Sequence, residues 1–238
     1  MVIPPSPTSN HMKETNMTHS RILKLCTLAA LSVALLLAIV PTLHGAATSS
    51  VGSDRVDAPV AQSWNVDTVH SCSLFRVRHM GAGWFWGRFN DVTGTIDFTP
   101  DDAASLKMDI AIDVDSVDSG HPDLDKHLKA PDFFDAKEFP QMTFKSTSVK
   151  AVPTTKRADD PALAWDVTGM LTVRGVSKEV VSRVTFWGAA DMGRGMKAGF
   201  ESTFKMKRSD FGVNYGVEAG ALGDMVTVTS AFEVNAAK

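Results

Sequence analysis

The chain has 238 residues, of which 44% are hydrophobic, and this length suits one domain of ordinary size once the N-terminus is set aside. Its formal net charge of −3 gives no basic surface of the kind that a phosphate backbone attracts, so nucleic acid is not an expected partner. Thirteen Phe and five Trp against a single Tyr favour an apolar interior over a polar recognition surface.

The N-terminal segment predicts an export signal. Arg21 and Lys24 precede an uncharged, mostly apolar run from Leu25 to Val40, and small residues follow it, which is the order of a secretory signal peptide. We therefore predict a signal peptide over residues 1–47 and a flexible tether over 48–63, and we expect the mature protein to be periplasmic or secreted. An uncleaved anchor is the alternative, although the run is short for a membrane-spanning helix.

Three alternating stretches follow the tether and predict an antiparallel meander with one apolar face. Two glycines, Gly87 and Gly94, fall on that face and are expected to leave space where a packed core would need volume, so we predict a hollow, curved sheet. The positions on the apolar face are Ser73, Phe75, Val77 and His79, then Phe85, Gly87 and Phe89, then Val92, Gly94, Ile96 and Phe98.

The alternation continues to the C-terminus, apart from one insert. In that insert Pro122 can open a helical turn, and Pro131 and Pro140 limit its extent. About eight antiparallel strands with one short helix predict an all-β, closed up-and-down barrel that can enclose a small ligand, with a two-sheet sandwich as the alternative. The later strands are expected near 106–114, 163–173, 180–186, 198–206 and 226–234.

Motifs spread along the chain resemble those of the YceI-like, polyisoprenoid-binding family. The resemblance runs from Trp64 to Val234, and it implies a lipocalin-like barrel domain over residues 64–235 that is exported to the periplasm. Ser73 and Ser182 depart from the pattern, because apolar residues are expected there. The motifs are WNVDxxHS from Trp64, FxVxH from Phe75, GxF from Gly87, GxIxF from Gly94, DKHL from Asp125, DFFD from Asp132, FP at Phe139, TF at Thr143, VxGxLTxxGVxK from Val167 and RSDFG from Arg208.

The resemblance also implies a function. The barrel would sequester or carry a long polyisoprenoid, such as an isoprenoid quinone or a polyprenyl phosphate, without a cofactor. A fatty acid or fatty amide is the alternative ligand, and a membrane protein could act as donor or acceptor. Cys72 is the only cysteine outside the predicted signal peptide, so it is expected to be a buried thiol or an occasional link in a homodimer.

Strand alternation selects candidate ligand contacts inside the barrel. A polar mouth is expected from His79, Arg208 and Asp210, which could meet a charged head group. A structural ion pair between Arg208 and Asp210 or another aspartate is the alternative role. The candidate lumen residues are Phe75, Val77, Phe85, Phe89, Ile96, Phe98, Phe144, Phe186, Phe200 and Phe204.

Two catalytic alternatives are weaker. His121, Asp123, Asp125 and His127 have the atoms of a metal site or a metal-dependent hydrolase, but the two histidines would not share a face of a helical turn. A triad built on Ser71 and His70 fails because adjacent residues of a strand point to opposite faces. We therefore expect no metal site and no enzymatic activity.

Overall fold

The computed structural model describes residues 62–99, 102–155, 157, 160–191 and 193–237. The predicted signal peptide and most of the predicted tether lie outside these ranges. The strand β1 begins at Gln62, so it takes up the last two residues that we assigned to the tether. Within the described ranges, no helix is both long and apolar enough to cross a membrane.

Eleven strands belong to one sheet, and a single α-helix lies in the described part of the chain. The helix α1 spans Pro122–Leu128, and two 3-10 turns, η1 (Val114–Ser116) and η2 (Arg208–Phe211), follow β5 and β10. The strands are β1 (Gln62–Val66), β2 (Cys72–His79), β3 (Gly83–Phe89), β4 (Val92–Thr99), β5 (Asp102–Asp113), β6 (Val117–Asp118), β7 (Gln141–Val152), β8 (Leu163–Val173), β9 (Val176–Asp191), β10 (Met196–Lys207) and β11 (Leu222–Ala236).

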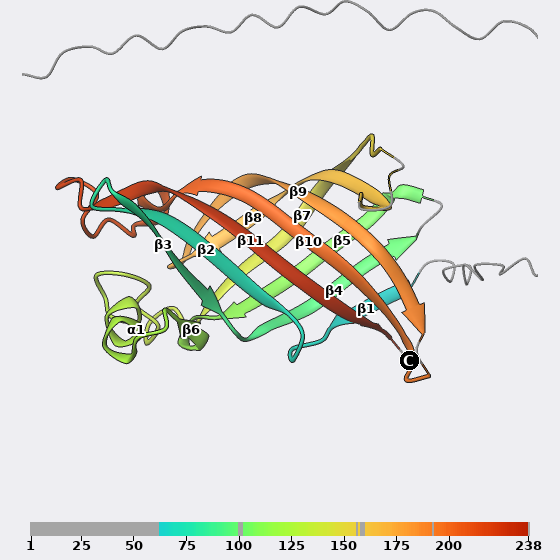
Figure 1. Ribbon diagram of the computed structural model, residues 1–238, viewed down its shortest axis with the longest axis horizontal. Coiled ribbons are helices and arrows are strands. Elements are labelled where there is room, and N and C mark those ends of the chain that lie inside the picture. The colour runs from blue at the N-terminus through green and yellow to red at the C-terminus, as the bar shows by residue number, and fades with distance from the viewer. Residues whose placement is uncertain (1–61, 100–101, 156, 158–159, 192, 238) are drawn as a thin grey trace, which may run out of the picture. The chain divides into compact units, whose positions relative to one another are not determined.

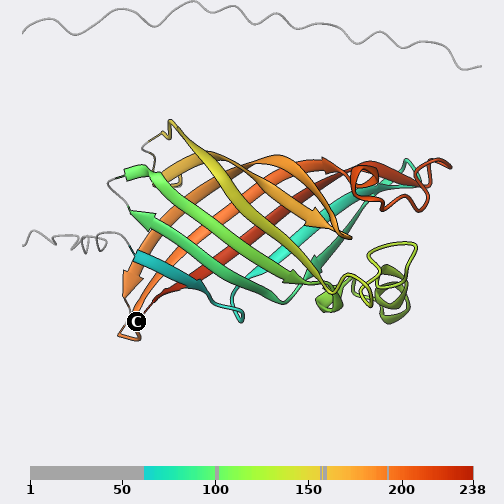
Figure 2. The ribbon, with the colours of Figure 1, turned by 180° about the vertical axis from the view of Figure 1, so that it is seen from behind.

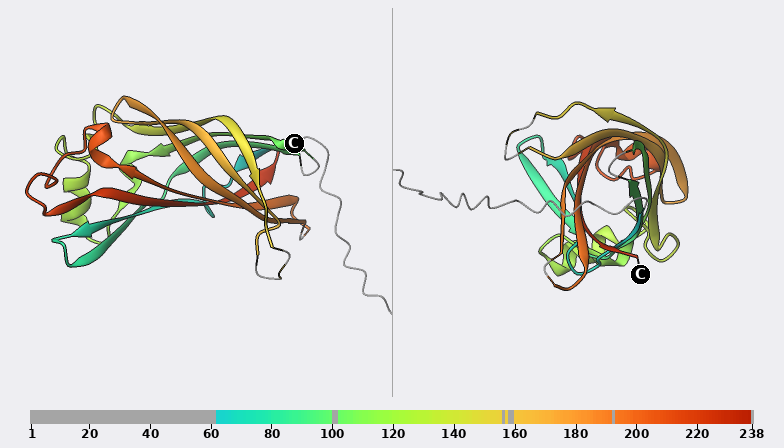
Figure 3. Two further views of the ribbon diagram at one scale, coloured as in Figure 1. Left: turned by 90° about the horizontal axis from the view of Figure 1, so that it is seen from above. Right: turned by 90° about the vertical axis from the view of Figure 1, so that its right-hand side faces the viewer.

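The eleven strands form a ring of eight positions. β1 and β2 run one after the other along β11, while β4 and β3 pair with them on the other side. β5 pairs with β4, and β6 pairs with β3, so three ring positions each contain two strands: β1 with β2, β4 with β3, and β5 with β6. The other five positions each contain one strand, from β7 to β11. Each ring position is therefore hydrogen-bonded to its neighbours in the chain, and the pairing of β1 with β11 closes the ring. The prediction of a closed antiparallel up-and-down barrel with one helix is confirmed (Figures 1 and 3).

The count of eight agrees with the prediction, but the strands that supply it differ. The stretches 85–89 and 92–98, which we predicted as two separate staves of the barrel, share one ring position as β3 and β4. The eighth position is occupied by β7, which we did not predict (Figure 2, yellow-green). β7 is hard to recognise in the sequence because its pairing with β8 shifts register between Ser146 and Ser148, which interrupts the alternation.

The two glycines of the apolar face do not create the hollow that we predicted. A Cβ on Gly94 would lie 2.1 Å from the carbonyl oxygen of Asp109, and the φ angle of Gly94 is +132°, so glycine is required there by the close approach of β4 and β5. A Cβ on Gly87 would lie 2.5 Å from the ring of Phe75. The ring of Phe75 therefore fills the space that Gly87 leaves.

The interior divides into two ends of different character. At one end, large side chains pack into a solid core in which the ring of Phe98 contacts Trp165, Phe186 and Phe200 at centroid distances of 5.0 to 5.7 Å. At the other end, near α1 and the β2–β3 hairpin, the apolar residues surround a cavity. The solid core consists of Trp64, Val66, Val92, Ile96, Phe98, Leu106, Met108, Ile110, Trp165, Val167, Val184, Phe186, Ala198, Phe200, Phe232 and Val234.

Candidate functional site

The cavity has a volume of about 730 Å³ and a mostly apolar wall. This volume lies in the range of ordinary small-molecule sites. Its lining comes from the inward faces of the barrel strands together with α1. Three of the lining residues, Met80, Trp84 and Tyr215, are about half exposed or more, and they mark the mouth beside the β2–β3 hairpin and the loop that follows η2.

The ten candidate lumen residues separate into two groups. Ile96 and Phe98, with Phe186 and Phe200, belong to the solid core and do not line the cavity, so we no longer consider them ligand contacts. Alternation alone places them inward but cannot say whether the barrel is hollow at their level. The six that line the cavity are Phe75, Val77, Phe85, Phe89, Phe144 and Phe204.

Arg208 is a structural clamp. Its side chain is 5% exposed, and its guanidinium donates four hydrogen bonds to backbone carbonyls of Val213, Tyr215, Leu222 and Gly223, at 2.8 to 3.2 Å. Burial lowers the pKa of Arg208, and the nearby carboxylate of Asp224 opposes this effect. Since its donors are largely occupied by the backbone, Arg208 supports the rim of the mouth and is poorly placed to bind a charged head group.

The other two residues of the predicted polar mouth have different positions. His79 lines the cavity and is exposed at the end of β2. Asp210 is exposed in η2 and does not line the cavity. Among the described residues, Arg208 and Asp210 do not form the ion pair that we considered, because the guanidinium is directed to the loop backbone.

Aromatic contacts connect α1 with the loop after η2 across the mouth. The ring of His127, on α1, lies edge-on to Phe133 and to Tyr215 at centroid distances of 4.9 and 5.0 Å. His127 Nε2 lies 2.7 Å from a carboxylate oxygen of Asp132. Leu124 and Leu128, on the same helix, line the cavity, as expected for a turn that packs its leucines inward. From the sequence, His127 was a candidate metal ligand and part of the DKHL motif, whereas its contacts place it at the mouth.

The four candidate metal ligands of the insert do not converge. Asp125 accepts hydrogen bonds from the amide and the hydroxyl of Ser119, and His127 is paired with Asp132. His121 and Asp123 are exposed at the start of the helix. In the part of the chain that the structure describes, the only group of three with ligand atoms close enough for a metal is Asp67, His70 and Glu233.

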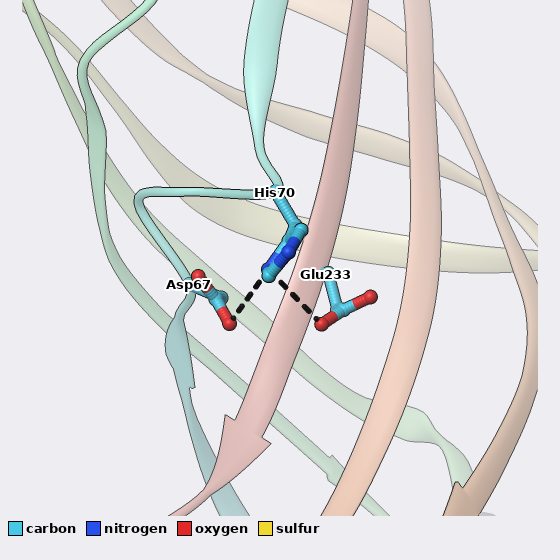
Figure 4. Close-up of side chains that lie close together, drawn as sticks. All are labelled: Asp67, His70 and Glu233. Carbon is cyan, nitrogen blue, oxygen red and sulfur yellow. Dashed lines mark ion pairs between the residues drawn. The ribbon is translucent and has the colours of Figure 1, made fainter.

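Figure 4 shows the side chains of Asp67, His70 and Glu233 close together, and a lysine, Lys197, contacts two of them. His70 Nδ1 lies 3.1 Å from Asp67 and 3.4 Å from Glu233. Lys197 Nζ lies 3.0 and 2.5 Å from the same two carboxylate oxygens, so its ammonium group already supplies the positive charge between them. The hydrogen bonds from Lys197 and His70 hold the pKa of Asp67 well below its usual value. The cluster ties the break between β1 and β2 to β10 and β11.

Ser71, next to this cluster, has a structural role. Its hydroxyl donates to the carbonyl of Glu233 at 3.2 Å and accepts from the amide of Glu233 at 3.1 Å. The hydroxyl proton is therefore directed to the backbone and not to His70, so this pair lacks the contact that activates a serine nucleophile.

Four buried serines lie at the inner end of the cavity, and the sequence singled out only two of them, Ser73 and Ser182. Ser73 pairs with Ser230 through their hydroxyls at 2.8 Å, and Ser182 pairs with Ser202 at 2.7 Å. All four line the cavity. Ser202 could have been found from the sequence, because it lies two residues from Phe200 and from Phe204, which the alternation placed inward. Ser230 likewise lies two residues from the buried Phe232.

A closed eight-stranded antiparallel barrel with a solid end and an apolar cavity defines a class of ligand-binding proteins. The chain belongs to the YceI-like family, because the model of the YceI-like domain matches residues 64–234. The fold of this family is that of a binding protein.

Relatives agree with this assignment. Protein YceI of Escherichia coli is 38% identical over 157 residues, which cover 65% of this chain and 78% of the relative. BcnA of Burkholderia cenocepacia has a similar structure, with a TM-score of 0.59 and 27% identity over 71% of this chain and 98% of that one. The YceI protein of Campylobacter jejuni has a TM-score of 0.57 and 32% identity over 68% and 90%. A polyisoprenoid binding domain from Saccharophagus degradans, at 14% identity and a TM-score of 0.55 over 74% and 99%, shares the fold.

Proposed function

We propose that this protein binds a long polyisoprenoid, or a similar amphiphile with a long apolar chain, and carries it outside the cytoplasm. The observation that supports this most strongly is the apolar cavity of about 730 Å³ that one end of the barrel encloses. The name of the Saccharophagus degradans domain supports the ligand class, and the order of charged, apolar and small residues in the N-terminal segment supports export.

The energetics favour an apolar chain. Each methylene that leaves water contributes about 0.8 kcal/mol, so about twenty carbons contribute roughly 16 kcal/mol before other terms. Loss of translational freedom and ordering of the chain cost about half of this or more. The remainder is enough for tight binding without any charged contact. We therefore infer that Phe75, Val77, Phe85, Phe89, Phe144 and Phe204 act as an apolar wall.

A matched pair of substitutions tests the location of the ligand. Val228 lines the cavity from β11, and its neighbour Thr227 points to the outer face. Val228→Trp should fill part of the cavity and lower the affinity for a fluorescent polyprenyl probe at least tenfold, because the probe loses the space that its chain needs. Thr227→Trp should leave binding unchanged. Equal binding by the two variants, both correctly folded, would place the ligand outside the cavity.

The identity of the bound lipid needs a separate measurement. Native mass spectrometry of the protein purified from its own source, followed by lipid extraction, should show a co-purified polyisoprenoid. A fatty acid or fatty amide in its place would support the alternative ligand class.

We further propose that binding requires no metal ion or other cofactor and that the protein is not an enzyme. Lys197 occupies the place of a cation between Asp67 and Glu233, and the ligand atoms of α1 have other partners. Chelation of divalent metals should therefore change neither the melting temperature nor the binding of the polyprenyl probe. Stoichiometric zinc in the purified protein and a large drop in melting temperature on chelation would contradict this.

A further inference from the structure

A row of hydroxyl groups crosses the inner end of an otherwise apolar cavity. Ser182, Ser202, Ser230 and Ser73 lie on four adjacent strands, in the order β9, β10, β11 and β2. Their side chains are 1%, 8%, 5% and 2% exposed, and all four line the cavity. Ser202, Ser230 and Ser73 are also direct partners in the strand register.

The register shows that this row lies deep. Along β2 the cavity lining runs from His79 at the mouth through Val77 and Phe75 to Ser73, a distance of about 20 Å for six residues of strand. On β10 the next inward residue beyond Ser202 is Phe200, which is part of the solid core. On β11 the next inward residue, Phe232, belongs to the solid core and also lines the cavity, so the serines form the polar part of the cavity floor at the border of the solid core.

One of the four serine hydroxyl groups has no acceptor for its proton. Each serine has one O–H group, and the pair Ser73–Ser230 shares a single hydrogen bond, so one of its two protons has no acceptor among the described contacts. In the second pair, Ser182 can also donate to the carbonyl of Thr203 at 3.3 Å, which can occupy both protons. Both serines of the first pair are buried and line the cavity, and a buried donor without an acceptor is unfavourable.

No charge accompanies these hydroxyls. The cavity-lining residues that can carry a positive charge are His79, His127 and Arg208, and all three lie towards the mouth. The guanidinium of Arg208 is held by the loop backbone. A carboxylate or phosphate at the floor would lose its hydration without gaining a cation, whereas a neutral oxygen needs only a hydrogen-bond donor.

We propose that the four serines form a subsite for a neutral oxygen at the polar end of the bound lipid, such as a hydroxyl, carbonyl or amide oxygen. The lipid then enters with its polar end first, and its hydrocarbon chain extends towards the mouth between Phe75 and Phe204. This proposal rests on the proposed function, because it assigns the orientation of a ligand in the same cavity. It also explains why this chain has Ser73 and Ser182 where the family resemblance implies apolar residues.

Two ligands that differ by one hydroxyl group provide the first test. Geranylgeraniol and the hydrocarbon of the same length without its hydroxyl compete with a fluorescent polyprenyl probe for the protein. The unmodified protein should prefer the alcohol about tenfold, which corresponds to one hydrogen bond. The double variant Ser73→Ala/Ser230→Ala should lose this preference and bind the hydrocarbon at least as well as before, because it removes both partners of a pair.

The outer face of the same strands supplies the control. Thr203 and Thr229 are adjacent to Ser202 and Ser230, and their hydroxyls pair at 3.3 Å on the outside of the barrel. Thr203→Val/Thr229→Val should keep the preference for the alcohol. If the unmodified protein binds both ligands equally, the subsite is absent but the proposed function stands. If it binds neither ligand, the proposed function itself fails.

A third test determines the orientation of the bound lipid and leaves the four serines unchanged. Trp84 lines the mouth. The fluorescence of Trp84 is the difference between the emission of the unmodified protein and that of the variant Trp84→Phe. A long-chain primary amide brominated at its methyl end should quench this fluorescence, because the methyl end lies at the mouth. The same amide brominated beside its carbonyl should not quench it. The reverse pattern would overturn the proposal, even if the serine variants fail to fold.

Discussion

Single residues show how closely the barrel strands approach one another. The Cβ that any substitution adds at Gly94 would meet the backbone of β5 at Asp109 and Ile110, at 2.1 to 3.0 Å, and the φ angle of +132° is unfavourable for other residues. We predict that Gly94→Ala lowers the free energy of unfolding by at least about 2 kcal/mol, because it separates β4 from β5. Denaturant unfolding measures the effect.

Gly199 provides the control for this prediction. It also lies within a strand, but the nearest atom to its Cβ would be 3.9 Å away, on Trp187, and its backbone is not in the left-handed region. Gly199→Ala should change stability by less than about 1 kcal/mol. Equal losses for the two variants would show that the contact with β5 is not the cause.

Arg208 permits a second prediction at this scale. Arg208→Ala should destabilise the protein by about 3 kcal/mol or more, because four carbonyls lose their donor and the rim loop is released. Arg208→Lys should recover little of this loss, since an ammonium group cannot reproduce the fork of the guanidinium. Denaturant unfolding of the ligand-free protein gives both values. If Arg208→Ala is stable and loses only the binding of anionic lipids, Arg208 binds a charged head group at the mouth, as the sequence predicted.

At the scale of elements, α1 and its flanking turns cover the mouth and are anchored from the β8–β9 hairpin. Arg174, in that hairpin, donates hydrogen bonds to the carbonyls of Pro131 and Phe133, and its guanidinium lies 6.0 Å from the ring of Phe139. The contact between the insert and the loop after η2 depends on the rings of His127, Phe133 and Tyr215. The anchor and the aromatic contact are separate, so they can be altered separately.

We predict that Tyr215→Ala accelerates release of a polyprenyl probe several-fold, because the variant removes the ring that bridges α1 and the loop at the mouth. Stability should change little, since Tyr215 is 48% exposed. Stopped-flow displacement measures the release rate, and thermal unfolding serves as the control. An unchanged release rate would mean that the ligand leaves by another route.

At the scale of the whole molecule, the charge cluster around Asp67 makes stability depend on pH. Lys197 first, and His70 second, lower the pKa of Asp67 in the folded state below its ordinary value of 3.8. A lowered folded pKa contributes stability above the unfolded pKa, and this contribution is lost as the pH falls through the folded value. We therefore predict that the melting temperature falls below about pH 4, and that Asp67→Asn flattens this dependence.

The same cluster stabilises the protein only up to an upper pH limit. Its two carboxylates raise the pKa of Lys197, so the stability that Lys197 contributes is present below pH 10.5 and is lost as the pH rises through its folded pKa. Thermal unfolding between pH 2 and 11 should show a plateau between these limits. A decline at acid pH that is identical in the unmodified protein and in Asp67→Asn would place the acid-sensitive group elsewhere.

Much of the fold could be predicted from local pattern. Alternation of apolar and polar residues is a property of consecutive residues, so it identified Ser73–His79 and most of the later strands and placed Ser73 inward. Ser182 was singled out by the family resemblance. The prolines around α1 predicted a helix of limited length. β7 was missed because its register shift breaks the alternation on which the prediction relied. β3 and β4 were counted separately because only pairing with a common neighbour shows that they occupy one ring position.

The sequence by itself determined which side chains face the interior, because the side-chain direction in a strand follows from position alone. Only the tertiary structure decided where the interior is solid and where it is hollow. That division depends on which inward residues meet across the barrel: Phe98 meets Phe200 and Trp165, whereas Phe75 and Phe204 border a cavity. It also decided that Arg208 binds the loop backbone and that four serines from separate strands share one floor, because these contacts join residues distant in the chain.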